Sequence, residues 1–218
     1  MVPKKRPPAI SAFWTMLCAP RETIRGIVRD KSGYQVSLLT VLLGVSLTLG
    51  QLALQRAGDG LPLVYILLIA LLAGPFIGML LVYIVSILLR WTGGWLGGKA
   101  SRAQVRAAYV WGSLPGLWVL PLWIPKLMVF GKELFTSAIP ITQANPVLLQ
   151  TLLVFTAIEI IAGIWSVVLI VIAISEVHRL PVWKGGLSLL MCLIIIVMPY
   201  AIQRVLAAAV HFRPLSGS

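Results

Sequence analysis

Residues 147–175, VLLQTLLVFTAIEIIAGIWSVVLIVIAIS, contain a single charged residue, Glu159. A helix needs about 20 apolar residues to cross the hydrocarbon core of a bilayer, so this stretch predicts a transmembrane helix. Four more apolar segments of suitable length follow the same pattern, at residues 36–54, 61–89, 107–130 and 186–209. The sequence therefore predicts an all-α fold, a polytopic transmembrane bundle of about five spans.

The composition agrees with a membrane protein. The chain is 59% hydrophobic and only 11% charged, whereas soluble domains are roughly half apolar and a quarter charged. The net charge of +12 would suggest nucleic acid in a soluble protein, but here the charges follow the expected loops, so no nucleic-acid partner is predicted. Cys18 and Cys192 form no CxxC motif, and neither a metal nor a cofactor is expected.

The basic residues predict the orientation. Thirteen of the 18 Lys and Arg residues fall at residues 4–31, 90–106 and 179–184, on one side of the five predicted spans. The other five lie on the opposite side or at the ends of spans that face it: Arg56, Lys126, Lys132, Arg204 and Arg213. Because Lys and Arg concentrate on cytoplasmic loops, we expect a cytoplasmic N-terminus and an external C-terminal tail. The lengths of the uncharged stretches and the lack of glycosylation sequons favour a bacterial inner membrane.

Tryptophans and one phenylalanine mark the two predicted interfaces. We expect Trp91, Trp95, Trp111 and Trp183 at the cytoplasmic interface and Trp123 and Phe130 at the outer one, as in aromatic belts.

Two of the spans contain helix-breaking residues. Gly74-Pro75 predicts a kink in the second span, because proline removes one backbone hydrogen bond. Three prolines in the third span predict either two half-helices or a span that ends early: Pro115, Pro121 and Pro125. Glycines in the first two spans, with Gly74 and Gly78 in a GxxxG pattern, permit close helix approach: Gly44, Gly50, Gly74 and Gly78.

The segment before the first span predicts a short amphipathic helix. Pro20 suits a first helical turn, and apolar residues recur at helical spacing opposite Arg21, Arg25 and Arg29. We expect this helix on the inner membrane surface with the three arginines at anionic headgroups; the alternative is a solvated basic tail. The domain organisation expected is thus residues 1–35 as a cytoplasmic basic segment, 36–210 as the five-span domain and 211–218 as a tail.

Glu159 is the one acidic residue predicted well inside a span. An isolated carboxylate there costs several kcal/mol unless it is protonated, paired or hydrated. Either it is a protonatable site facing a cavity, or it is a neutral acid hydrogen-bonded to a neighbouring helix. Arg204 is the nearest basic residue by predicted depth, but it lies closer to the outer surface and is expected to extend outward.

The glycine-rich turn Gly93–Lys99 is not a phosphate loop, because the GxxxxGK[ST] spacing and a βα unit are absent. It predicts a flexible turn leading to a short basic helix over residues 101–106, with Ser101 as the N-cap. Glu176 and His178, at i and i+2, face different sides of a helix and predict no metal pair. No catalytic set can be assembled at one depth, so an enzyme is not expected.

Three stretches resemble the Yip1 domain family of five-span membrane proteins. They are APRETIR at 19–25; GGKAS at 97–101 followed by AAY at 107–109 and SLP at 113–115; and residues 165–178 with WKG at 183–185. The resemblance implies a five-span fold and gives weight to Gly97, Gly98, Lys99, Tyr109 and Pro115. Eukaryotic members are linked to vesicle trafficking and small GTPases through a long N-terminal region; this chain is similar to the short prokaryotic members.

The favoured interpretation is a non-enzymatic membrane scaffold with a membrane-organising or trafficking-like role. It would associate with copies of itself or with other membrane proteins. The alternative is a small transporter or lipid-handling protein that uses Glu159 in a cavity near the kinked second and broken third spans. The surroundings of Glu159 distinguish the two: a dry helix contact favours the scaffold, and a hydrated cavity shared with Gln150, Tyr109 or Ser113 favours transport.

Overall fold

The computed structural model describes residues 15–16, 19–30, 33–137 and 145–211, and all its regular elements are helices. Five of them are long and apolar enough to cross a membrane: Gly33–Leu54, Gly74–Trp95, Leu114–Phe135, Pro146–His178 and Val182–Gln203. The predicted all-α bundle of five spans is confirmed.

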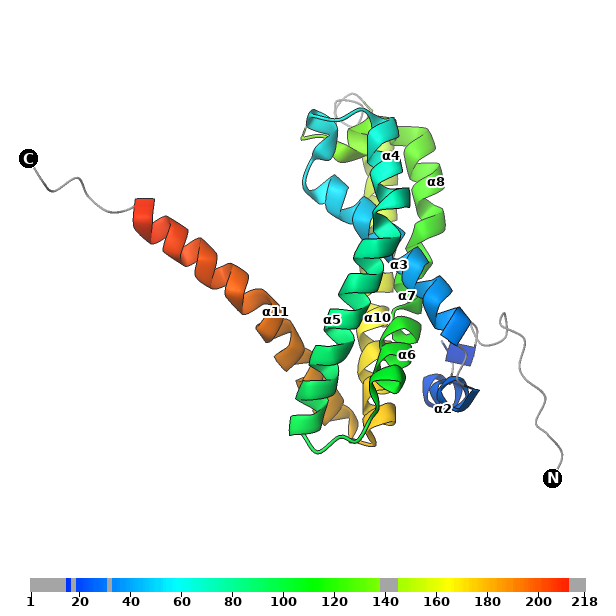
Figure 1. Ribbon diagram of the computed structural model, residues 1–218. Helices are drawn as coiled ribbons and strands as arrows, with labels where there is room; N and C mark the ends of the chain where they lie inside the picture. Colours follow the sequence, from blue (N-terminus) through cyan, green and yellow to red (C-terminus); the bar gives the residue numbers. More distant parts are fainter. Residues whose placement is uncertain (1–14, 17–18, 31–32, 138–144, 212–218) are drawn as a thin grey trace, which may run out of the picture.

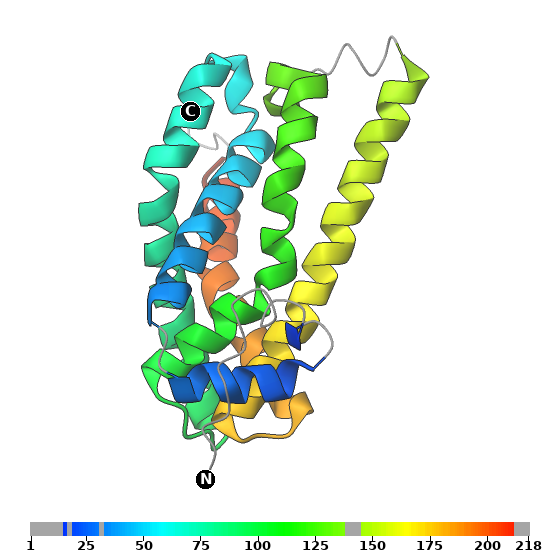
Figure 2. The ribbon, with the colours of Figure 1, turned by 90° about the vertical axis from the view of Figure 1, so that its right-hand side faces the viewer.

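The spans run between two ends of the molecule (Figure 2). At one end, helix α2 (Pro20–Asp30) crosses the bundle. We call this the α2 end; the turn between α5 (Gly74–Trp95) and α6 (Arg102–Gly112) also lies there. The other is the η end, where the 3₁₀ helices η1 (Ala57–Asp59) and η2 (Gly131–Phe135) meet. Ser137 N donates a hydrogen bond to Asp59 Oδ1 there, at 3.0 Å.

The second predicted span is two helices, α4 (Leu63–Leu72) and α5, with the break at Ala73. This is the kink that Gly74-Pro75 predicts. Two backbone hydrogen bonds still span the bend, from Ala73 N to Ile69 O and from Ile77 N to Ala73 O, while Pro75 has no N–H to donate. Together α4 and α5 connect the η end to the α2 end.

Glycines bring α5 against α3 (Gly33–Leu54). A Cβ on Gly44 would overlap the carbonyl oxygen of Gly74 and lie 2.7 Å from the Cα of Gly78. The two backbones therefore touch, and the GxxxG pattern is used for packing as predicted. A Cβ on Gly50, also in α3, would meet nothing within 4 Å.

The third span differs from its predicted limits of 107–130. Residues 107–112 belong to α6, which runs obliquely at the α2 end (Figure 2). The crossing begins after a corner at Ser113, with α7 (Leu114–Leu117) and α8 (Val119–Phe130). The prolines cause the difference, because Pro115 begins a new helix instead of extending α6. Helix α6 starts at the predicted N-cap Ser101, with a complete capping box, and continues past Arg106 to Gly112.

The fourth span is α10 (Pro146–His178), which contacts α2, α6, α7 and α8. The fifth, α11 (Val182–His211), packs against α5 and α10 near its start and then diverges from the bundle (Figure 1). Among the described residues of α11, the buried ones are Gly185, Ser188, Leu189 and Cys192, and from Leu193 to Met198 every side chain is exposed.

The main core lies towards the α2 end, and Trp111, Leu114 and Leu169 are central to it. A smaller cluster at the η end surrounds Trp123 and Phe135. The predicted aromatic belts are only partly correct. Trp91, Trp95 and Trp183 are exposed, but Trp111, Trp123 and Phe130 are buried within the protein.

Candidate functional site

The predicted site residues fall into two groups at different levels of the bundle. Gly97, Gly98, Lys99 and the arginines of α2 lie at the α2 end, and Glu159 lies in the half nearer the η end. Tyr109 and Pro115 are packed between these levels, in or against the main core.

The glycine-rich turn closes the C-terminal end of α5. The carbonyl of Gly93 accepts hydrogen bonds from the amides of Leu96 and Gly98, at 3.2 and 2.8 Å. Gly97 has φ +94°, a left-handed conformation that L side chains rarely adopt. The ammonium of Lys184 caps the helix by donating to the carbonyl of Leu96 at 3.3 Å. The turn is therefore fixed, not merely flexible as the sequence predicted.

His178 is the residue that holds this turn in place, and the sequence did not single it out for that role. Its side chain is 2% exposed and lies between two glycines. A Cβ on Gly93 would lie 2.6 Å from the imidazole, and a Cβ on Gly98 would overlap Nδ1. Gly98 is thus required for packing against His178, and Gly97 for backbone conformation.

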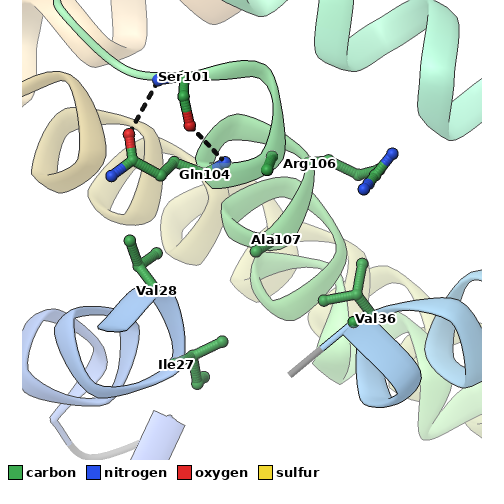
Figure 3. A pocket seen from close by; sticks show the side chains of 9 residues that line it. Ile27, Val28, Val36, Ser101, Gln104, Arg106 and Ala107 are labelled. Atoms are coloured by element: carbon green, nitrogen blue, oxygen red, sulfur yellow. Dashed lines mark hydrogen bonds between the residues drawn. The ribbon is translucent and has the colours of Figure 1, made fainter. Parts of the chain in front are cut away.

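Helix α2 docks on the protein itself. Ile24 is fully buried, and Ile27 and Val28 face Ala107 of α6 and Val36 of α3 across a cavity of about 320 Å³ (Figure 3). The predicted amphipathic helix exists, but much of its apolar face contacts protein rather than the membrane surface.

The basic face of α2 also contacts the bundle. Arg25 Nε lies 2.5 Å from Glu176 Oε1 of α10, and this hydrogen bond raises the pKa of the Arg25 guanidinium. Arg25 is thus paired within the chain, although its side chain is 68% exposed; its place among headgroups stays a prediction. Arg21 is exposed, and the side chain of Arg29 lies outside the described residues.

Tyr109 and Pro115 belong to the packing of the α2 half. Burial raises the pKa of Tyr109 to about 12, so its phenol is neutral at physiological pH. The Tyr109 carbonyl accepts from the hydroxyl of Ser113 at 2.9 Å. Pro115 is buried at the corner before α8, where Gly116 N donates to Ser166 Oγ of α10 at 2.9 Å.

Glu159 has a partner that the sequence did not indicate. Lys126 Nζ of α8 lies 2.6 Å from Glu159 Oε1 of α10. The Lys126 side chain is 7% exposed and that of Glu159 is 26% exposed. The ammonium also lies 4.8 Å from the ring centroid of Trp123, which stacks on Phe135 at 5.7 Å. Lys126 is therefore held by a carboxylate and an aromatic face together.

The sequence named Arg204, not Lys126, as the nearest basic residue, because depth was counted from the helix ends; the side chain of Arg204 lies outside the described residues. Helix α10 has 33 residues, about 50 Å at 1.5 Å per residue, far longer than a perpendicular crossing needs. Residue number along so long a helix does not fix depth.

The ion pair is a contact between helices. Glu159 lines none of the five cavities that stand out in the described part of the chain, and neither Tyr109 nor Ser113 lines one of them with it. Among the described residues, no group of three or more His, Cys, Asp or Glu side chains could hold a metal ion.

The comparisons with known proteins place this architecture in one family. A family model described as Yip1 domain matches residues 14–202, most of the chain. No curated protein and no solved structure matches.

Proposed function

The chain belongs to the Yip1 domain family of membrane proteins, and on that premise we propose that it is a non-enzymatic scaffold that organises other components of the membrane. It would act by associating with copies of itself or with other membrane proteins. The proposal concerns a role in assembly, with no chemical step and no cofactor.

The Lys126–Glu159 pair is the observation that carries this proposal. A transport site in the membrane needs its acidic residue open to water or substrate. Here the carboxylate lies 2.6 Å from an ammonium that is itself 7% exposed. The pair joins α8 to α10, so it supports a structural role for Glu159 and counts against the transporter alternative.

Helix α11 offers the surface for association. Beyond Cys192 its described residues have no neighbour that buries them, and Ile194, Val197 and Met198 are each more than half exposed. Lipid can cover such a helix, but so can an equivalent helix of a second molecule, since packing in membranes relies on close contact rather than on hydrophobicity.

We place the protein in a bacterial inner membrane with its N-terminus and α2 end in the cytoplasm. The concentration of Lys and Arg in the segments at that end supports this placement. Arg21, which is exposed, would then be available to anionic headgroups.

Cysteine cross-linking in native membranes tests the scaffold. In a background with Cys18→Ser and Cys192→Ala, Val197→Cys on α11 should form a disulfide-linked dimer or a bismaleimide adduct with another membrane protein. Leu71→Cys on α4, 63% exposed, is the matched control and should remain monomeric. If neither Val197→Cys nor Ile194→Cys forms an adduct, association through α11 is refuted.

A further inference from the structure

A basic cavity opens beside the glycine-rich turn at the α2 end. Its volume is about 340 Å³, and it is lined by Arg90, Trp91 and Trp95 of α5 and by Gly98, Lys99 and Ala100 of the turn. Nothing in the proposed scaffold function uses it.

The cationic groups of this cavity have no acidic partner in the described part of the chain. The ion pairs there are Lys126–Glu159 and Arg25–Glu176, and neither includes a residue that lines this cavity. Arg90 is half-buried and Lys99 is exposed. Two unpaired cations on one cavity favour an anionic ligand.

The backbone around the cavity is compatible with an anion. The C-terminal carbonyls of α5 would repel one, but Gly93 O is bonded to two amides and Leu96 O to the ammonium of Lys184. Helix α6, whose N-terminal end is positive, begins at Arg102, directly after the turn. The amides of Lys99 and Ala100 donate no hydrogen bond to another described residue.

The surface that leads to the cavity is apolar. Trp91 and Trp95 are 55% and 66% exposed, as expected for rings at headgroup level. Farther along α5, away from the turn, three more exposed apolar side chains lie at helical spacing on the same side of the helix: Ile77, Leu80 and Ile84. Together with the two tryptophans they form an exposed apolar stripe on α5. A ligand with both a phosphate and acyl chains fits this combination better than a soluble phosphate does.

We propose that this cavity binds the phosphate group of an anionic phospholipid. Arg90 and Lys99 contact the phosphate, Trp91 and Trp95 flank the glycerol region, and the acyl chains lie along the exposed stripe of α5. The inference does not depend on whether the chain associates with itself, because every group named belongs to one molecule.

Lipid binding to the purified, delipidated full-length protein in a neutral detergent tests the site. Native mass spectrometry would compare phosphatidylglycerol with phosphatidylcholine of identical acyl chains. We expect tighter binding of phosphatidylglycerol. Arg90→Gln with Lys99→Gln should weaken it about 30-fold, since each charge near a headgroup contributes ~1 kcal/mol. Phosphatidylcholine should lose less affinity, because its own choline cation already balances the phosphate.

Two further variants keep the result interpretable. Lys99 is exposed, so Lys99→Gln alone will fold even if the double variant does not, and it should cost roughly fivefold. Arg56→Gln with Lys132→Gln removes the same charge at the η end and should have no effect on phosphatidylglycerol binding.

Three results would overturn the proposal. Equal binding of the two lipids would mean that no anionic headgroup site exists. An equal loss in the η-end control would mean that overall charge, not this cavity, attracts the lipid. Displacement of phosphatidylglycerol by soluble glycerol phosphate at equal concentration would show that the site takes a free phosphate group.

Discussion

At the level of single residues, the Lys126–Glu159 pair predicts an asymmetric response to mutation. Removing one partner of a buried ion pair leaves the other charge uncompensated, which costs about 3–5 kcal/mol when both are fully buried. Because Glu159 is 26% exposed, we expect Glu159→Gln to lower the free energy of unfolding by about 3 kcal/mol. Thermal unfolding in detergent would measure this.

The double variant supplies the control for that measurement. Lys126→Met with Glu159→Gln removes both charges and should recover most of the lost stability. Glu22→Gln, at an exposed position of α2, should change nothing. If Glu159→Gln alone were neutral, Glu159 would be an uncharged, hydrogen-bonded acid, and the ion pair would be disproved.

His178 and Gly98 form a second pair that can be tested by a double-mutant cycle. Gly98→Ala places a methyl group on the imidazole and should cost about 1–3 kcal/mol of stability through overpacking. His178→Ala removes the imidazole but not the carbonyl oxygen of Gly93, which would lie 2.8 Å from the same Cβ. The double variant should therefore be partly relieved, and less destabilised than the sum of the single variants. Gly94→Ala, where a Cβ meets nothing within 4 Å, should be tolerated. Strictly additive effects would exclude the contact.

At the level of elements, the contact of α3 with α5 depends on the missing side chain of Gly44. Gly44→Ala would force the helices apart, because the new Cβ overlaps the backbone of both Gly74 and Gly78. We expect a loss of about 2–3 kcal/mol. Gly50→Ala in the same helix has room and should be neutral or slightly stabilising. Equal melting temperatures for the two variants would contradict the packing described.

The docking of α2 depends on its apolar face more than on its charge. Ile24 is fully buried, whereas the Arg25 side chain is 68% exposed. Ile24→Asp should therefore release α2 and increase amide hydrogen exchange over residues 20–30. Arg25→Gln should have little effect, because exposed ion pairs contribute little to stability. Exchange that rises in both variants alike would show that the ion pair holds the helix.

The sequence predicted those elements whose signal is local, and it missed the features that depend on how helices pack together. The spans were predictable because apolar length is a local property, and the kink at Gly74-Pro75 because proline acts locally. The cap at Ser101 was readable for the same reason. The partner of Glu159 and the role of His178 were not, since both depend on which helices pack together and at what relative height. The start of the third crossing was predictable only in part. The prolines that interrupt the segment can be read from the sequence, but the oblique direction of α6 cannot.

At the level of the whole molecule, the two ends differ in charge and in construction. The α2 end carries the glycine-rich turn, α2 and most of the basic residues. At the η end, the described connections between spans include the short 3₁₀ helices η1 and η2, with Gly58 packed against the backbone of Phe135. An orientation that places the α2 end in the cytoplasm satisfies the positive-inside rule.

This orientation predicts which positions an impermeant thiol reagent will reach on intact cells. In a background without Cys18 and Cys192, Gln55→Cys and Lys132→Cys at the η end should be labelled. Lys99→Cys and Arg179→Cys at the α2 end should be labelled only after permeabilisation. All four side chains are exposed in the structure, so protection of one end can come only from the membrane. The reverse pattern would put the N-terminus outside and move the basic cavity to the outer leaflet. Gln55 and Lys132 lie on different connections between spans. Labelling of Lys132→Cys alone would mean that α3, with α4 and α5, fails to cross. Labelling of Gln55→Cys alone would mean that α8, with α10, fails to cross.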